Sequence, residues 1–151
     1  MPNKPRIILV DDFQMFRQGL VSIISLGNVA TVIGEASNEV EFMELITQRN
    51  PDLVLMDIDM CGMNVTDATR KALQLLPHLK IIVYNMFGRE EHFDDMITLG
   101  VNGFILKSLG IIELEKAIGQ VMTGESYFPP RSPKKPSGNF NAEKPERPTD
   151  L

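Results

Sequence analysis

Leu53-Val54-Leu55-Met56-Asp57, near the middle of the chain, is a run of four apolar residues that ends in a carboxylate. An uninterrupted apolar run of this length is typical of a β-strand buried on both faces, as in a parallel sheet covered by helices. The same pattern occurs near the N-terminus, where Ile7-Ile8-Leu9-Val10 is followed by Asp11 and Asp12. Both segments therefore predict buried strands with acidic residues at their carboxyl ends.

Three more apolar runs continue this pattern, at residues 30–33, 81–84 and 103–106. Between and after the runs, apolar residues recur at helical spacing, as do Phe13, Phe16, Leu20 and Ile23 in the first such stretch. Strand and helix therefore alternate as a βα unit that is repeated five times before residue 124. This alternation predicts an α/β fold in which right-handed crossovers join a parallel sheet that is covered on both faces.

The composition is typical of a globular protein of one domain. The chain has 151 residues, 43% of them hydrophobic and 23% charged. Its net charge of -5 argues against direct binding to nucleic acid, which requires clustered basic residues. No apolar run is long enough to span a membrane, and the single cysteine, Cys61, suits a reducing compartment. We therefore expect a cytoplasmic protein that binds neither membrane nor nucleic acid.

The chain changes character after residue 124. Residues 125–151 hold most of the ten prolines and show no apolar periodicity. Such a segment has little apolar surface to bury. We therefore expect a folded domain over residues 5–124 and a proline-rich tail, disordered or extended, over residues 125–151.

Polar residues stand at the ends of four predicted strands: Asp11 and Asp12, then Asp57, then Asn85, then Lys107. The carboxyl ends of parallel strands form the ligand-binding edge of such a sheet. Each residue alone has an ordinary explanation, such as a helix cap or a solvated side chain. Together, however, they would place three carboxylates side by side, and two carboxylates ~4 Å apart repel by ~4 kcal/mol at an effective dielectric constant of about 20.

Three neighbouring carboxylates need a cation, and Mg²⁺ prefers hard oxygen ligands of this kind. A carboxylate beside Mg²⁺ and a lysine is also an activated nucleophile toward phosphorus. The residues therefore predict a magnesium site that forms an aspartyl phosphate.

Three segments together resemble the receiver domain of bacterial two-component response regulators: Ile8–Asp12, Leu53–Asp57 and Gly100–Lys107. The resemblance extends over residues 5–124. It implies a flavodoxin-like, doubly wound, five-stranded parallel sheet with five helices, (βα)5, and the strand order 2-1-3-4-5.

The resemblance also implies a role for each site residue. Asp57 accepts a phosphoryl group from a sensor histidine kinase or a phosphotransfer protein, and Lys107 pairs with that group. Asp12 binds Mg²⁺ directly, Asp11 acts largely through water, and the backbone carbonyl of Asp59 completes the metal site.

Phe104 matches the aromatic residue whose rotamer follows activation in this family; a plain core phenylalanine is the alternative. The signal would pass through the fourth helix, the fifth strand and the fifth helix. The resemblance implies a phosphoacceptor signalling domain that can form a homodimer. The resemblance implies that the chain is not an enzyme, beyond phosphorylating itself from small donors and dephosphorylating itself.

The chain departs from the family pattern at several positions. Asn85 stands where the family has Ser or Thr, Cys61 and Ser108 replace prolines, and Val65 replaces a glycine. The amide of Asn85 can still donate a hydrogen bond, but it is bulkier than a hydroxyl. We therefore expect phosphorylation with a muted conformational switch.

Two other segments, Asp67–Arg70 and Gly124–Phe128, resemble the subfamily in which a helix-turn-helix output domain follows the receiver. No output domain follows in this sequence. We therefore expect either a stand-alone receiver or a truncated protein.

Two alternatives stay open. Asn85 favours a non-phosphorylated pseudo-receiver that acts only as an interaction module, although the intact acidic residues oppose it. Asp57-Ile58-Asp59 also resembles the Asp-x-Asp signature of haloacid-dehalogenase-like phosphatases, with Asp57 as nucleophile and Asp59 as general acid/base. Against the phosphatase stand Cys61 and the position of Asp57 after the third strand rather than the first.

Overall fold

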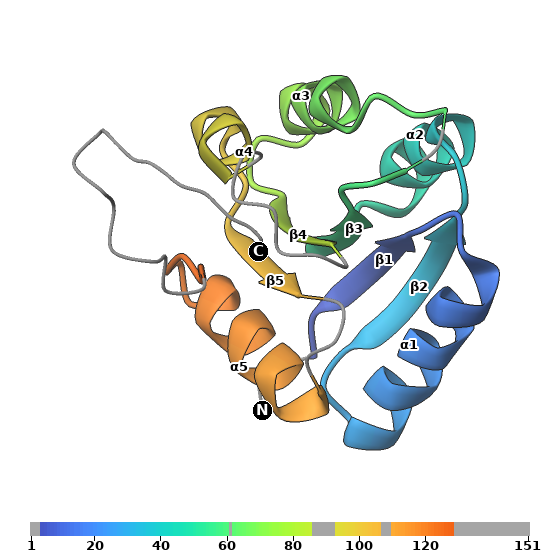
Figure 1. Cartoon of the computed structure of the whole chain (residues 1–151), viewed down its shortest axis with the longest axis vertical. Helices are drawn as coiled ribbons and strands as arrows, with labels where there is room; N and C mark the ends of the chain where they lie inside the picture. Colours follow the sequence, from blue (N-terminus) through green and yellow to red (C-terminus); the bar gives the residue numbers. More distant parts are fainter. Residues whose placement is uncertain (1–3, 61, 86–92, 107–109, 129–151) are drawn as a thin grey trace, which may run out of the picture.

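The computed structural model describes residues 4–60, 62–85, 93–106 and 110–128 (Figure 1). Its strands are β1 (Arg6–Val10), β2 (Thr31–Ala36), β3 (Leu53–Asp57), β4 (Lys80–Asn85) and β5 (Gly103–Leu106). Its helices are α1 (Gln14–Gly27), α2 (Glu39–Arg49), α3 (Val65–Leu75), α4 (Phe93–Leu99) and α5 (Ile111–Met122). The five strands form one parallel sheet in the order β2-β1-β3-β4-β5. The predicted (βα)5 fold and strand order are therefore confirmed.

Helices cover both faces of the sheet, α1 and α5 on one side and α2, α3 and α4 on the other (Figure 1). Successive side chains of a strand point to opposite faces. In β1, Ile8 and Val10 accordingly pack with α2 and α3, whereas Ile7 and Leu9 pack with α1 and α5. Strand β3 is buried at every position, including its last residue, Asp57. The double coverage explains why the strands are continuous apolar runs rather than alternating ones.

The segment after α5 packs beside the edge strand β5. Tyr127 forms an isolated parallel bridge with Gly103. Its N–H donates to the Asn102 carbonyl (2.9 Å), and its own carbonyl accepts from the N–H of Phe104 (2.8 Å). A Cβ at position 103 would lie 3.0 Å from the Tyr127 carbonyl oxygen, so glycine permits this close approach. The packed chain thus continues through Phe128, past the expected boundary at residue 124, and the prolines from 129 onward lie outside the described residues.

Within the part of the chain that the structure describes, no helix is both long and apolar enough to cross a membrane.

Candidate functional site

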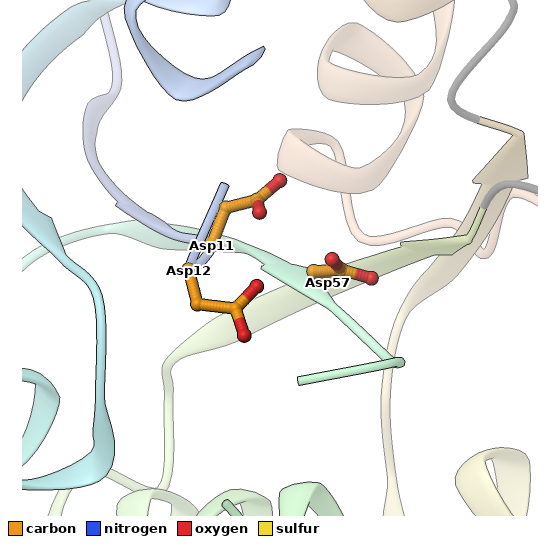
Figure 2. A group of neighbouring side chains, drawn as sticks. All are labelled: Asp11, Asp12 and Asp57. Atoms are coloured by element: carbon orange, nitrogen blue, oxygen red, sulfur yellow. The ribbon is translucent and has the colours of Figure 1, made fainter. Parts of the chain in front are cut away.

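Two neighbouring strands bring three carboxylates together at the carboxyl edge of the sheet. Asp11 and Asp12 directly follow β1, and Asp57 ends β3, which pairs with β1. One carboxylate oxygen from each residue lies within 4.8 Å of the other two (Figure 2). The juxtaposition follows from the parallel register, in which Val10 pairs with Met56.

The three carboxylates differ in their exposure to solvent. Asp11 is 0% exposed and Asp57 3% exposed, whereas Asp12 lies at the surface. Burial removes the hydration that stabilises an ionised carboxylate, so hydrogen-bond donors or a cation must replace it. Two backbone donors contribute: Phe13 N–H to Asp11 Oδ1 (2.8 Å) and Asp59 N–H to Asp57 Oδ1 (2.9 Å).

Tyr84 supplies a side-chain donor to the same cluster. It lies on β4 opposite Asp57, and its hydroxyl donates to Asp11 Oδ2 at 2.8 Å. Burial, followed by the negative charge and the hydrogen bond of Asp11, raises the pKa of Tyr84 well above its usual value. The hydroxyl therefore remains a neutral donor. Tyr84 is not among the residues predicted from the sequence, where its only signal is a polar atom within an apolar run.

Arg17, on α1, brings a positive charge close to the cluster. Its guanidinium donates to the backbone carbonyl of Asp11 and forms an ion pair with Glu35 on β2, with Nε 2.8 Å from Oε1. Only 12% of the Arg17 side chain is exposed. Arg17 is also not among the residues predicted from the sequence, because a single arginine in an amphipathic helix does not indicate which residues it will contact.

The other predicted site residues are described only in part. Asp59 lies two residues after Asp57, the last residue of β3, and is exposed. Phe104, on β5, is 1% exposed and belongs to the core on the α2, α3 and α4 side. Asn85 ends β4, but its side chain lies outside the described part, and Lys107 and Cys61 lie outside the described residues altogether.

The donor set fits a hard divalent cation. It consists of carboxylate oxygens from adjacent strand ends, two of which belong to buried residues. Mg²⁺ is bound in proteins by one or two carboxylates while it keeps several of its waters. Asp12, at the surface, leaves the cluster open to solvent on one side. The residues present therefore match what a magnesium site requires.

Comparison with known proteins agrees with this geometry. A family model of the response regulator receiver domain matches residues 7–119. The transcriptional regulatory protein DegU of Brevibacillus brevis is 31% identical over 129 residues, which cover 85% of this chain and 55% of that protein. The nitrate/nitrite response regulator protein NarL of Escherichia coli (strain K12) is 35% identical over 119 residues, covering 79% of this chain and 55% of that protein. The chain thus spans about half the length of these relatives.

Solved structures show the same similarity. The crystal structure of a two-component response regulator of the LuxR family from Aurantimonas sp. SI85-9A1 has a TM-score of 0.77 and 28% sequence identity. The match covers 83% of this chain and 89% of that one. The signal receiver domain of the putative response regulator NarL from Mycobacterium tuberculosis has a TM-score of 0.74 and 28% identity, over 82% of this chain and 100% of that domain.

Proposed function

Because this chain belongs to the response regulator receiver domain family, we propose that it is a phosphorylatable signalling domain whose phosphoacceptor is Asp57. The donor is the phosphohistidine of a sensor histidine kinase or of a phosphotransfer protein, and the exchange takes place in the cytoplasm. The observation that carries the proposal is the buried Asp57 carboxylate at the end of β3, grouped with Asp11 and Asp12 within 4.8 Å.

In the proposed reaction, an oxygen of Asp57 attacks the phosphorus of the phosphohistidine. The O–P bond forms as the N–P bond breaks, and the electron pair of the broken bond stays on the imidazole nitrogen. The ring takes up one proton from solvent and becomes neutral histidine. The Asp59 N–H, bonded to Asp57 Oδ1, keeps the carboxylate oriented at the strand end. Bound Mg²⁺ would supply positive charge that offsets the phosphoryl oxygens. Asp11, Asp12, Asp57 and the backbone carbonyl of Asp59 are the groups that would hold the ion.

Two residues at the ends of β4 and β5 complete the proposed site. Lys107 follows the last residue of β5 and would pair with the phosphoryl oxygens. Asn85, the last residue of β4, would donate its amide in place of the Ser or Thr hydroxyl. Both assignments rest on the family resemblance of the sequence.

The proposed output surface consists of α4, β5 and α5. Phe104 lies in the core beneath this surface, and its backbone N–H is bonded to Tyr127 beyond α5. A movement of β5 would therefore reach the segment that leads out of the domain. We propose that the domain signals by binding protein partners, a second copy of itself among them, and does not bind nucleic acid or turn over a substrate.

Phosphorylation by a small donor tests the proposal. The protein is incubated with Mg²⁺ and phosphoramidate, and its intact mass is measured. We expect one added phosphoryl group, which Asp57→Asn abolishes. The matched control is Asp59→Asn, which removes an exposed carboxylate close by in the sequence and leaves the backbone carbonyl in place; it should still be labelled.

Two results would contradict the proposal. Labelling that persists in Asp57→Asn would mean that another residue accepts the phosphoryl group. Turnover of a chromogenic phosphate ester that is lost in Asp59→Asn would favour the phosphatase interpretation, in which the Asp59 side chain is the general acid/base.

A further inference from the structure

We propose that Tyr84 tunes the cation affinity of the phosphorylation site, because its hydroxyl donates to the Asp11 carboxylate and so competes with the cation for that negative charge. The inference rests on the proposed function, because it takes Asp11 as one of the groups that hold Mg²⁺. Through this hydrogen bond, a carboxylate of the proposed metal site contacts β4 directly, and β4 ends at Asn85.

The place of Tyr84 in the sheet explains how it reaches Asp11. Tyr84 pairs with Asp57 on β3, and Asp11 follows β1 on the other side of β3. The side chain of Tyr84 belongs to the apolar cluster beneath the sheet on the α1 and α5 side. Its ring packs against Phe16 of α1, with 5.7 Å between the ring centroids. From this position the hydroxyl reaches Asp11 Oδ2, at the end of β1, which β3 separates from β4.

Asp11 is held from two directions. Phe13 N–H donates to Oδ1 and the Tyr84 hydroxyl donates to Oδ2, each at 2.8 Å. Figure 2 shows the carboxylates of Asp11 and Asp12 directed to opposite sides of the chain, with Asp57 beside them. Because Asp11 is 0% exposed, these donors take the place of water around its charge.

Tyr84 also contacts the loop that follows the proposed phosphoacceptor. Its backbone carbonyl accepts the N–H of Ile58 at 2.8 Å, one residue after Asp57. A cation that draws on the charge of Asp11 would therefore affect Tyr84. The backbone of Tyr84 is hydrogen-bonded to Ile58, directly after Asp57, and its neighbour in the chain is Asn85. This links the filling of the cation site to the end of β4.

The direction of the effect follows from how firmly Asp11 is held. Losing Tyr84's hydroxyl would leave the Phe13 hydrogen bond and the complete burial of Asp11, so its orientation should largely survive. The main loss is a donor that offsets the negative charge of an already repulsive cluster. A cation should then gain more by binding. We expect Tyr84→Phe to bind Mg²⁺ roughly threefold to tenfold more tightly, while melting at a lower temperature than wild type in chelator.

The test combines a titration with a spectroscopic signal. Mg²⁺ affinity is measured by calorimetry for wild type, Tyr84→Phe and the matched control Tyr127→Phe, which removes the only other tyrosine of the chain. In Tyr127→Phe, Tyr84 is the sole tyrosine and there is no tryptophan. Adding Mg²⁺ should then shift its near-ultraviolet absorption as the bond to Asp11 weakens, with an affinity equal to that of wild type.

A thermodynamic cycle tests whether Asp11 mediates the effect. The change in Mg²⁺ affinity caused by Tyr84→Phe should disappear when Asp11 is replaced by Asn. Tyr84→Phe with unchanged or weaker affinity, or an effect that persists in Asp11→Asn, would overturn the inference. If the inference fails in this way but Tyr84→Phe is still phosphorylated at Asp57, the proposed function stands without the inference. If wild type neither binds Mg²⁺ nor accepts phosphate, both fail.

Discussion

Replacing Asp57 by asparagine should stabilise the metal-free protein, although it removes the proposed phosphoacceptor. Asp57 and Asp11 are both buried, and their nearest carboxylate oxygens lie within 4.8 Å. Two unit charges at that distance repel by about 3.5 kcal/mol at an effective dielectric constant of about 20. The donors on both carboxylates already offset part of this repulsion, so only a part of it can be recovered by removing one charge.

The substitution removes the charge but keeps the shape of the side chain. Asparagine retains an oxygen that can accept the Asp59 N–H, so the turn after β3 should survive. We therefore expect a net gain of about 1–2 kcal/mol in the free energy of unfolding. For a domain of this size the melting temperature should rise by roughly 3–8 °C.

Thermal melts in chelator and in Mg²⁺ measure this effect. Wild type should gain stability on adding Mg²⁺, because the cation offsets the same repulsion, and Asp57→Asn should gain less. The control is Glu115→Gln on the exposed surface of α5, which changes the net charge equally and should shift stability by less than about 0.5 kcal/mol. If Asp57→Asn melts at or below wild type in chelator while the control is unchanged, carboxylate repulsion does not govern the site.

Two further predictions concern the switch and the C-terminal segment. Asn85→Thr should enlarge the amide chemical-shift changes of α4 and β5 on adding beryllofluoride, because a hydroxyl fits the inward movement better than the bulkier amide; equal shifts in both proteins would show that Asn85 is a competent substitute. A chain ending at Phe128 should keep its free energy of unfolding, because residues 129–151 have few apolar side chains to bury. Removing residues 125–128 as well should lower the free energy of unfolding, since the hydrogen bonds to β5 are lost. A loss of several kcal/mol on truncation at residue 128 would contradict this.

The fold could be predicted because each of its layers leaves a local pattern. A strand buried on both faces is a continuous apolar run, and β3 shows this over its whole length. A helix that covers the sheet has apolar residues every third or fourth position, as α5 has at its buried residues Leu114, Ala117, Ile118 and Val121. Ligands bind at the carboxyl ends of parallel strands, so the sequence alone groups Asp11, Asp12 and Asp57.

What could not be predicted depends on contacts between distant residues. Tyr84 and Asp11 are 73 positions apart, and their bond requires the order of β1, β3 and β4 together with the face on which Tyr84 lies. The attachment of Tyr127 to β5 combines backbone hydrogen bonds with the packing of two aromatic residues, Tyr127 and Phe128, which are too few to give a periodic pattern. Both features depend on the tertiary arrangement rather than on local preference.

The missed residues explain how the fold tolerates the predicted ones. Buried carboxylates at adjacent strand ends would destabilise a metal-free domain if nothing offset their charge. The hydroxyl of Tyr84 and the N–H of Phe13 donate to Asp11, and Arg17 adds a positive charge at its carbonyl. These donors stabilise the buried charge of Asp11 in the metal-free state, and for the same reason they should reduce the free energy that a cation gains by binding.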